Sequence, residues 1–336
     1  MRQISCLRVV STILTSTMRS HTYTESIGSA RIMAKILDGK KIAKDIKDEL
    51  KIQIQEWVKE GYRAPSLCCI IVGDDPASHT YVKNKVLAAQ YCGINAETIK
   101  FESTITEEFL LDKIKELNES DIVDGILIQL PVPDTMDERK VCNAVSPHKD
   151  VDGFHIVNVG QLCLDMKTIV PATALGVVEM IKRSGIETHG RKAVVIGRSK
   201  NVGMPIAIML HTDKKHESGL GMDATVTICH RYTPKNDLEF FCQNADIIIS
   251  ATGIPGLVKA NMIKPGATVI DVGITRITDA EGKTKLVGDV DYDEVIKIAG
   301  AVTPVPGGVG PMTVAMLMHN TFQAAKNLRE KTVKIS

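Results

Sequence analysis

Tyr81 and Lys85 are four positions apart in the segment SHTYVKNK (78–85), which follows a polar turn. On an α-helix, residues i and i+4 lie on one face, so a phenol and an amine would point into the same space. Such a pair can hold a flat ring and move a proton. A solvated helix whose lysine stem lies along its own surface gives the same pattern. The pair by itself leaves both an active site and a surface helix open.

A glycine-containing loop in AVVIGRSKNVGMP (193–205) is the second candidate site. An apolar segment runs into Gly197, and Gly203 precedes Pro205, where a helix would begin. Glycines permit a tight turn and let a pyrophosphate approach backbone N–H groups at a helix amino terminus. The spacing is not G-x-G-x-x-G, so a structural turn is an alternative. A nicotinamide-dinucleotide site is the better interpretation of the loop in this context.

The composition restricts the classes of protein that fit. The 336 residues include 41 Lys and Arg against 40 Asp and Glu, which leaves no general positive field for nucleic acid or anionic membranes. Any anion-binding site must therefore be local. With 44% hydrophobic and 24% charged residues, the chain is expected to be globular and is long enough for two domains. It has no run of 18 apolar residues, so we expect no membrane insertion.

The eight cysteines show no CxxC pairing. Zinc ligation and a disulfide framework are therefore poorly supported. We expect these thiols to be small buried hydrophobic residues in a reducing compartment.

Residues 1–33 differ in composition from the rest of the chain. They contain several arginines, many Ser and Thr, and no acid before Glu25, which is typical of a mitochondrial transit peptide. A secretory signal fits less well because the apolar segment is short and interrupted, and a disordered tail is an alternative. Met33 is a candidate alternative start.

The elements that must position these residues alternate between strand and helix patterns from Ile36 onward. Short apolar runs predict buried parallel strands, and apolar residues at 3–4 spacing predict helices. The expected strands are 67–73, 96–101, 123–130, 192–197, 224–229, 245–251 and 267–273. The expected helices are 40–58, 77–92, 106–118, 171–185, one from about Pro205, and 310–328. This alternation predicts an α/β fold with parallel sheets.

Five segments in order resemble the bifunctional methylenetetrahydrofolate dehydrogenase/methenyltetrahydrofolate cyclohydrolases. They are SHTYVKNK, DGILIQLPVP, PHKDVDGFH, VVIGRSKNVGMP and TPVPGGVGPMT, and the resemblance runs from about Ile36 to Lys326. The stretch 221–234 is most similar to the mitochondrial, NAD-dependent type. The resemblance implies two parallel-sheet lobes around a cleft, the second a Rossmann-type domain. It also implies a folate-binding domain at 36–153, completed by a helix at about 310–330, and an NAD-binding domain at 178–306.

The family's folate residues carry over onto matching positions. The resemblance implies that Tyr81 shapes the folate site, that Lys85 is the acid/base of the cyclohydrolase step, and that Gln129 hydrogen-bonds Lys85. A lysine that activates water should spend time neutral, which favours a partly desolvated position. Asp152 would accept hydrogen bonds from the pterin, as suits a carboxylate. The remaining folate contacts would be Ser78, Ile128, Leu130, Pro306, Gly307 and Gly308.

The implied cofactors are NAD, inorganic phosphate and Mg²⁺. NAD would contact Gly197, Arg198, Ser199, Gly203, Arg231, Ile274, Pro306, Gly307, Gly308, Val309 and Gly310. Phosphate would bind Arg198 and Arg231 in place of the 2′-phosphate of NADP, and magnesium would bind Asp223. The alternative is that these are solvated surface charges.

The resemblance further implies a homodimer in the mitochondrial matrix that binds a folate substrate and NAD, with no nucleic-acid partner. An NADP-preferring member of the same family is an alternative. A short-chain oxidoreductase also carries Tyr-x-x-x-Lys, but there the motif follows the glycine loop, whereas here it precedes it. A catalytically silent binding module would lack the set Lys85, Gln129 and Asp152, all of which are present.

Overall fold

The computed structural model of the chain describes residues 34–215, 219–278, 282 and 284–333, with the side chains of residues 76–80 and 330–333 excluded. The predicted transit peptide and Met33 lie outside the described residues. The described residues all belong to one compact unit. None of the described helices is both long and apolar enough to cross a membrane.

Three parallel strands form the smaller sheet, in the order β3–β2–β4. They are β2 (Ser66–Val72), β3 (Asn95–Phe101) and β4 (Gly125–Ile128). Six of the seven residues of β2 are buried, because a strand with helices on both faces must be apolar on both. The predicted strand at 123–130 is shorter in the structure, so Gln129 and Leu130 follow β4 directly.

Helices cover both faces of this sheet. They are α1 (Gly39–Lys59), α2 (Pro76–Cys92) and α3 (Glu107–Glu119). Cys69 of β2 belongs to the apolar cluster of α1 and α2, whereas its neighbour Cys68 belongs to the cluster of α3. Helix α1 starts where the Asp38 side chain accepts from the Lys41 N–H at 3.0 Å, a normal amino-terminal cap. The alternation along β2 therefore sets which helix packs on which face.

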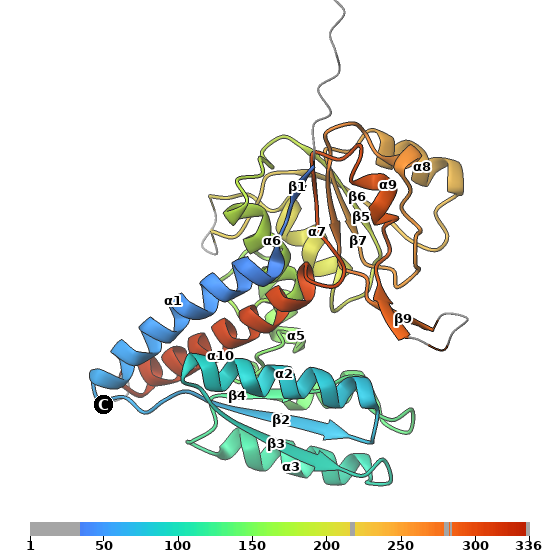
Figure 1. Ribbon diagram of the computed structural model, residues 1–336. Coiled ribbons are helices and arrows are strands. Elements are labelled where there is room, and N and C mark those ends of the chain that lie inside the picture. The colour runs from blue at the N-terminus through green and yellow to red at the C-terminus, as the bar shows by residue number, and fades with distance from the viewer. Residues whose placement is uncertain (1–33, 216–218, 279–281, 283, 334–336) are drawn as a thin grey trace, which may run out of the picture. The chain divides into compact units, whose positions relative to one another are not determined.

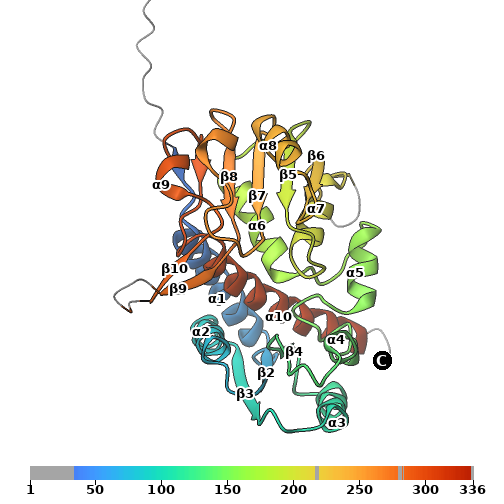
Figure 2. The ribbon, with the colours of Figure 1, turned by 90° about the vertical axis from the view of Figure 1, so that its right-hand side faces the viewer.

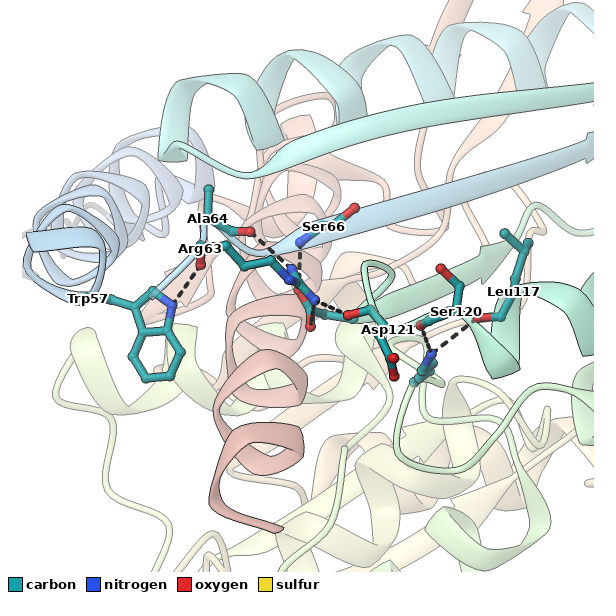
Figure 3. Close-up of polar contacts among 9 residues, drawn as sticks. Trp57, Arg63, Ala64, Ser66, Leu117, Ser120 and Asp121 are labelled. Atoms are coloured by element: carbon teal, nitrogen blue, oxygen red, sulfur yellow. Dashed lines mark hydrogen bonds and ion pairs between the residues drawn. The ribbon is translucent and has the colours of Figure 1, made fainter. Parts of the chain in front are cut away.

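A partly buried ion pair joins the strand ends at the base of this lobe (Figure 3). Arg63 precedes β2 and donates through both terminal nitrogens to Asp124, at 2.6 and 2.8 Å, and to the Asp121 carbonyl at 2.8 Å. Asp124 also accepts from the Ser66 N–H at 2.8 Å. Nearby, the buried Lys149 amine donates to the Leu117 and Ser120 carbonyls at the end of α3, and burial lowers its pKa. These contacts fix the base of β2 to the segment that leads into β4.

Six parallel strands form the larger sheet, in the order β1–β11–β8–β7–β5–β6 (Figure 2). They are β1 (Lys35–Ile36), β5 (Lys192–Ile196), β6 (Thr225–Cys229), β7 (Ile247–Ser250), β8 (Thr268–Asp271) and β11 (Ala301–Val302). The four predicted strands of this lobe are confirmed. The two short strands β1 and β11 were not predicted, because a strand of two residues is too short to show a periodic pattern of apolar residues.

The connecting helices pack around this sheet. Helices α6 (Ala172–Arg183) and α7 (Gly203–His211) share one apolar cluster, and α8 (Lys235–Gln243) and α9 (Tyr292–Val295) share the other. The remaining elements are α4 (Glu138–Ala144), α5 (Ile156–Cys163), the short 3₁₀ helix η1 (Ala260–Met262), and the antiparallel hairpin β9 (Thr275–Thr278) and β10 (Thr284–Val287). The sequence did not predict this hairpin.

Helix α10 (Val309–Val333) packs on helices of the first lobe. Figure 1 shows it beside α1, and it also contacts α2, β4 and α6. Asn320 of α10 donates to the Val151 carbonyl at 2.9 Å and to the Val170 carbonyl at 2.8 Å. The predicted α/β class with two parallel sheets is confirmed.

Candidate active site

The Lys85 amine donates to Oε1 of the Gln129 side-chain amide at 3.0 Å, so the predicted hydrogen bond is present. Lys85 lies on α2 and is half-buried, and Gln129 directly follows β4. Gln129 is itself held in place, because its amide nitrogen donates to the Leu130 carbonyl at 2.7 Å and its backbone N–H donates to Ile70 at 2.9 Å. The amine is thus oriented by a rigid partner at the end of a buried strand.

Asp152 is electrostatically coupled to this pair. Burial raises the pKa of its carboxyl to about 6, the Lys85 charge opposes that rise, and the neighbouring Asp150 adds to it. Asp150 is structural: its carboxylate accepts from the backbone of Gly153 and His155 and from the Asn158 amide. The two acids of the DVDG turn therefore differ in role, and Asp152 is the one available to a ligand.

Tyr81 is 41% exposed and lines a cavity of about 630 Å³ between α1, α2, the start of α10 and the β9–β10 hairpin. The cavity is also lined by Ile274 and Gly310, which the sequence assigned to cofactor contact. Ser78 lies in the first turn of α2, but its side chain is outside the described part of the structure. The folate residues Ile128 and Leu130 flank Gln129 at the end of β4.

The loop VPGGVGP (305–311) packs its backbone closely against α1. The Lys40 N–H donates to the Gly307 carbonyl at 3.1 Å, and a Cβ on Gly39 would lie 1.8 Å from the Gly308 carbonyl oxygen. Gly307 has φ +116°, which bulkier residues rarely adopt. Pro306 is exposed at the tip, whereas Val309 is buried as the first residue of α10. Glycine is therefore required for the shape of this loop, whatever it binds.

The loop after β5 has the close contacts expected of a dinucleotide turn. A Cβ on Gly203 would lie 2.3 Å from the Gly197 carbonyl oxygen, and Gly197 has φ +123°. The Ser199 hydroxyl accepts from the N–H groups of Val202 and Gly203 at 3.2 and 3.3 Å. The loop thus leads directly into the amino terminus of α7, a favourable position for an anion.

Arg198 and Arg231 follow neighbouring strands, β5 and β6. The strand register pairs Ile196 with Cys229, so the two arginines each lie two residues beyond the same rung. The Arg198 guanidinium lies 5.8 Å from the Tyr232 ring centroid, and both arginines are exposed. Both arginines therefore lie at the carboxyl edge of the sheet.

Asp223, the predicted magnesium ligand, lies at the other end of β6 from these arginines. Asp223 precedes β6, whereas Arg231 follows it, and five strand residues at about 3.3 Å each separate the two ends. The Asp223 carboxylate instead contacts His189 Nδ1 at 3.3 Å and the Lys214 N–H at 3.2 Å. Among the described residues, no group of three His, Cys, Asp or Glu side chains is placed to hold a metal ion.

Six of the seven described cysteines are buried free thiols, as predicted, but Cys163 at the end of α5 is exposed. Two further histidines in or near the motifs accept backbone hydrogen bonds. His155 Nδ1 accepts from Val157, and His230 Nδ1 accepts from Tyr232. Both therefore have a local structural role.

The sequence missed a pair of buried acids under the cofactor loops. Asp289 is fully buried and accepts from Ser250 Oγ at 2.9 Å and from the Thr252 N–H at 2.7 Å. Asp271 accepts from the backbone of Gly273 and Asp289, and burial raises its pKa to about 6. The pair braces the chain just after β7 and β8, next to Ile274. No sequence pattern distinguishes these acids from solvated ones.

Two sequence models of one family match the chain. The model described as "Tetrahydrofolate dehydrogenase/cyclohydrolase, catalytic domain" matches residues 37–152, and the "NAD(P)-binding domain" model of the same family matches residues 171–329. A rat (Rattus norvegicus) protein named "Bifunctional methylenetetrahydrofolate dehydrogenase/cyclohydrolase 2, mitochondrial" is 57% identical over 301 residues, which cover 89% of each chain.

Solved structures are similar over nearly the same length. A 5,10-methylenetetrahydrofolate dehydrogenase from the silkworm Bombyx mori is 69% identical with a TM-score of 0.85, and the match covers 89% of this chain and all of that one. The dehydrogenase-cyclohydrolase of Trypanosoma brucei, solved with NADP and an inhibitor, is 39% identical with a TM-score of 0.80, covering 88% of this chain and 98% of that one.

Proposed function

The chain belongs to the tetrahydrofolate dehydrogenase/cyclohydrolase family, and from this membership we propose that it catalyses two successive reactions on one folate. The first oxidises 5,10-methylenetetrahydrofolate to 5,10-methenyltetrahydrofolate. The second adds water to the methenyl carbon and opens the ring to give 10-formyltetrahydrofolate with release of a proton. The observation that carries the proposal is the Lys85–Gln129 hydrogen bond beside the Asp152 carboxyl.

Each residue of this group has a distinct task. The Lys85 amine, held by Gln129, takes the proton from water in the hydrolytic step. Asp152 accepts hydrogen bonds from the amino-pyrimidine edge of the pterin and so orients the reacting carbon. Tyr81 lines the cavity next to Ile274 and Gly310, where its ring can pack on the folate. A bound nicotinamide supplies the hydride acceptor, and the protein contributes the alignment of donor and acceptor.

Replacing Lys85 tests the hydrolytic role. Lys85→Met should lower the conversion of methenyl- to 10-formyltetrahydrofolate at least about a hundredfold, because general acid–base groups contribute rate factors of this size. Both steps are measured spectrophotometrically on one preparation, with circular dichroism as the folding check. Gln129→Ala should slow the same step less severely. Hydrolysis at the wild-type rate in Lys85→Met would remove this residue from the mechanism.

We propose NAD as the cofactor, with inorganic phosphate on Arg198 and Arg231. An NAD ribose lacks the phosphate that NADP would offer to two exposed arginines, and a free phosphate supplies the missing charge. NAD-linked activity should then rise with added phosphate, and Arg231→Ser should lose this response. Phosphate dependence that survives in Arg231→Ser would refute the site. NADP-linked activity above NAD-linked activity would instead favour the NADP-preferring alternative.

Magnesium fits less well than phosphate. The Asp223 carboxylate already contacts Lys214 and His189, and it lies at the opposite end of β6 from the arginines. We therefore assign no step to a metal ion within one chain.

The remaining assignments are proposals from the relatives. The rat relative is named mitochondrial, and residues 1–33 have a transit-like composition, so we infer a matrix location. A reporter fused to residues 1–33 that stays outside mitochondria would contradict it. We also propose the domain limits 36–153 and 178–306, and a homodimer formed through the larger sheet.

A further inference from the structure

Both peptide groups that flank Asp152 are held by side chains. The Asn320 amide donates at 2.9 Å to the Val151 carbonyl, which belongs to the peptide group between Val151 and Asp152. The Asp150 carboxylate accepts at 3.1 Å from the Gly153 N–H, which belongs to the peptide group between Asp152 and Gly153. Because a peptide group is planar, each of these hydrogen bonds fixes the direction of a whole plane. The backbone on both sides of the Asp152 side chain is therefore held in a fixed direction.

Asn320 reaches this turn from α10, where it is 3% exposed. The same amide nitrogen also donates to the Val170 carbonyl at 2.8 Å, so both of its hydrogens are used. Val170 directly precedes Pro171, the residue before α6, and both Val151 and Val170 are buried. Without the amide, two buried carbonyl groups would each lose a donor. Asn320 thus ties the turn that carries Asp152 to the start of α6.

Asn158 of α5 holds the other side of the turn through Asp150. Its amide nitrogen donates to the Asp150 carboxylate at 2.9 Å and to the Pro147 carbonyl at 3.0 Å. Its carbonyl oxygen accepts from the Thr168 hydroxyl at 2.9 Å. Asn158 is also 3% exposed, and Asp150 is buried beside it. A chain of hydrogen bonds therefore runs from Thr168 through Asn158 to the carboxylate of Asp150.

The turn is also anchored on the strand that positions the catalytic amide. Asp150 forms an isolated parallel bridge with Ile126 of β4, and the Ile126 N–H donates to the Lys149 carbonyl at 2.7 Å. Gln129 directly follows the same strand. The turn and Gln129 are therefore both positioned by β4.

We propose that Asn320 and Asn158 are positioning residues that fix the Asp152 carboxylate for folate binding. The proposal rests on the proposed function, because it takes Asp152 to accept hydrogen bonds from the pterin. Both asparagines are buried, so they act through the turn and not by contact with the folate. A carboxylate that meets donors on a flat ring needs a fixed direction, and a displacement of about 1 Å in a reacting site can cost about a hundredfold.

The test measures the Michaelis constants for 5,10-methylenetetrahydrofolate and for the nicotinamide cofactor, in the dehydrogenase assay on the full chain. Asn320→Ala and Asn158→Ala should each raise the constant for the folate about tenfold and keep that for the cofactor within about twofold of the wild type. The kcat should fall less than the folate KM rises, because the lost interaction is one of binding. Circular dichroism and thermal unfolding establish that each variant is folded at the assay temperature.

A second background separates positioning from a general structural role. Asp152→Ala has no carboxylate, so Asn320 has nothing left to position there. Adding Asn320→Ala to Asp152→Ala should therefore change the folate KM by less than about twofold, whereas independent effects would multiply. Thr321→Val is the matched control, because Thr321 is the next residue of α10, is fully buried, and donates to the Leu317 carbonyl of the same helix at 2.8 Å. This control should keep both Michaelis constants.

Two milder variants cover the case in which an alanine variant does not fold. Asn320→Ser retains a polar hydroxyl in place of the amide, and Thr168→Val removes only the hydroxyl that donates to Asn158. Each should raise the folate KM about three- to fivefold, the effect of one lost hydrogen bond. An unchanged folate KM in both of these variants would overturn the proposal by itself.

Several outcomes would overturn the proposal while leaving the proposed function intact. They are an unchanged folate KM in the folded alanine variants, an equal rise in the cofactor KM, an undiminished effect in the Asp152→Ala background, and a similar rise in Thr321→Val. If the wild type did not oxidise the folate, or if Asp152→Ala kept the wild-type folate KM, the proposed function itself would fail. The two failures are thus distinguishable.

Discussion

At the scale of single residues, the site depends on how the structure changes ordinary side chains. The Lys85 amine is held by its hydrogen bond to Gln129 at 3.0 Å, which suits the proton transfer that we propose for it. Asp152 becomes a group that titrates in the working pH range because burial raises the pKa of its carboxyl from 3.8 to about 6. Asp150, two positions away, is fully engaged by backbone and amide donors. Neighbouring identical residues therefore have different functions.

The raised pKa of Asp152 predicts that acidification lowers the activity while it raises the stability of the fold. Only the ionised carboxylate accepts from the pterin, so kcat/KM for the folate should fall about tenfold per pH unit below about 6. The folded state binds more protons than the unfolded state between pH 3.8 and about 6. Through this group alone, stability therefore rises as the pH falls through that window.

The matched variant for this prediction is Asp152→Asn, which cannot titrate. It should have a raised KM for the folate at all pH values and should lack the inflection near pH 6 in kcat/KM. Thermal unfolding followed at pH 7 and pH 5 should show a smaller gain on acidification than in the wild type. An unchanged inflection in this variant would show that another group causes it.

At the scale of elements, the site is built where strands end and backbone segments meet. The loop after β5 brings Gly203 against Gly197, and the 305–311 loop brings Gly308 against Gly39 at the start of α1. A side chain at either contact would overlap a carbonyl oxygen, so glycine is needed for packing as well as for ligand approach. The β9–β10 hairpin adds Arg276 to the cavity beside Tyr81. The elements therefore determine which distant residues share a site.

At the scale of the whole molecule, α10 connects the two sheets. It begins within the 305–311 segment, which follows β11 of the larger sheet, and packs on α1 and α2 of the smaller one. Helix α10 also packs closely on α6 at Gly176, where a Cβ would lie 3.1 Å from the Met312 side chain. The two lobes thus share one apolar cluster, to which α1, α2, α6, α7 and α10 all contribute.

The larger sheet also predicts how copies of the chain associate. β6 is an edge strand, with no described strand on its outer side, and the nearby Ile228 and Tyr232 are 38% and 74% exposed. Pairing with a second copy would cover this edge. Sedimentation equilibrium should therefore give a dimer mass at micromolar concentration, and Ile228→Lys should shift the protein toward a monomer. A wild-type monomer under those conditions would contradict the proposed homodimer.

The sequence by itself determined the α/β class, most strands and helices, and the residue types of the chemistry. These follow from local signals: apolar runs with a clear period, glycines in loops, and motif segments that resemble one family. The short strands β1 and β11 and the β9–β10 hairpin were not predicted. They are stabilised by pairing with other strands, and their own sequences show no clear periodicity. Local patterns therefore predict only those elements that are long enough to show a periodic arrangement of apolar residues.

Only the tertiary structure decided which charges share a site. Asp223 and Arg231 are eight positions apart, yet an extended strand places them at opposite edges of the sheet. Arg276 is far in sequence from Lys40 and Lys47, yet all three line one cavity, and no local pattern marks them as a group. The same holds for Asp152, because burial in the folded chain raises the pKa of its carboxyl while the Lys85 charge on α2 opposes that rise. Electrostatic and burial effects depend on distances in space, so they become visible only when the chain is folded.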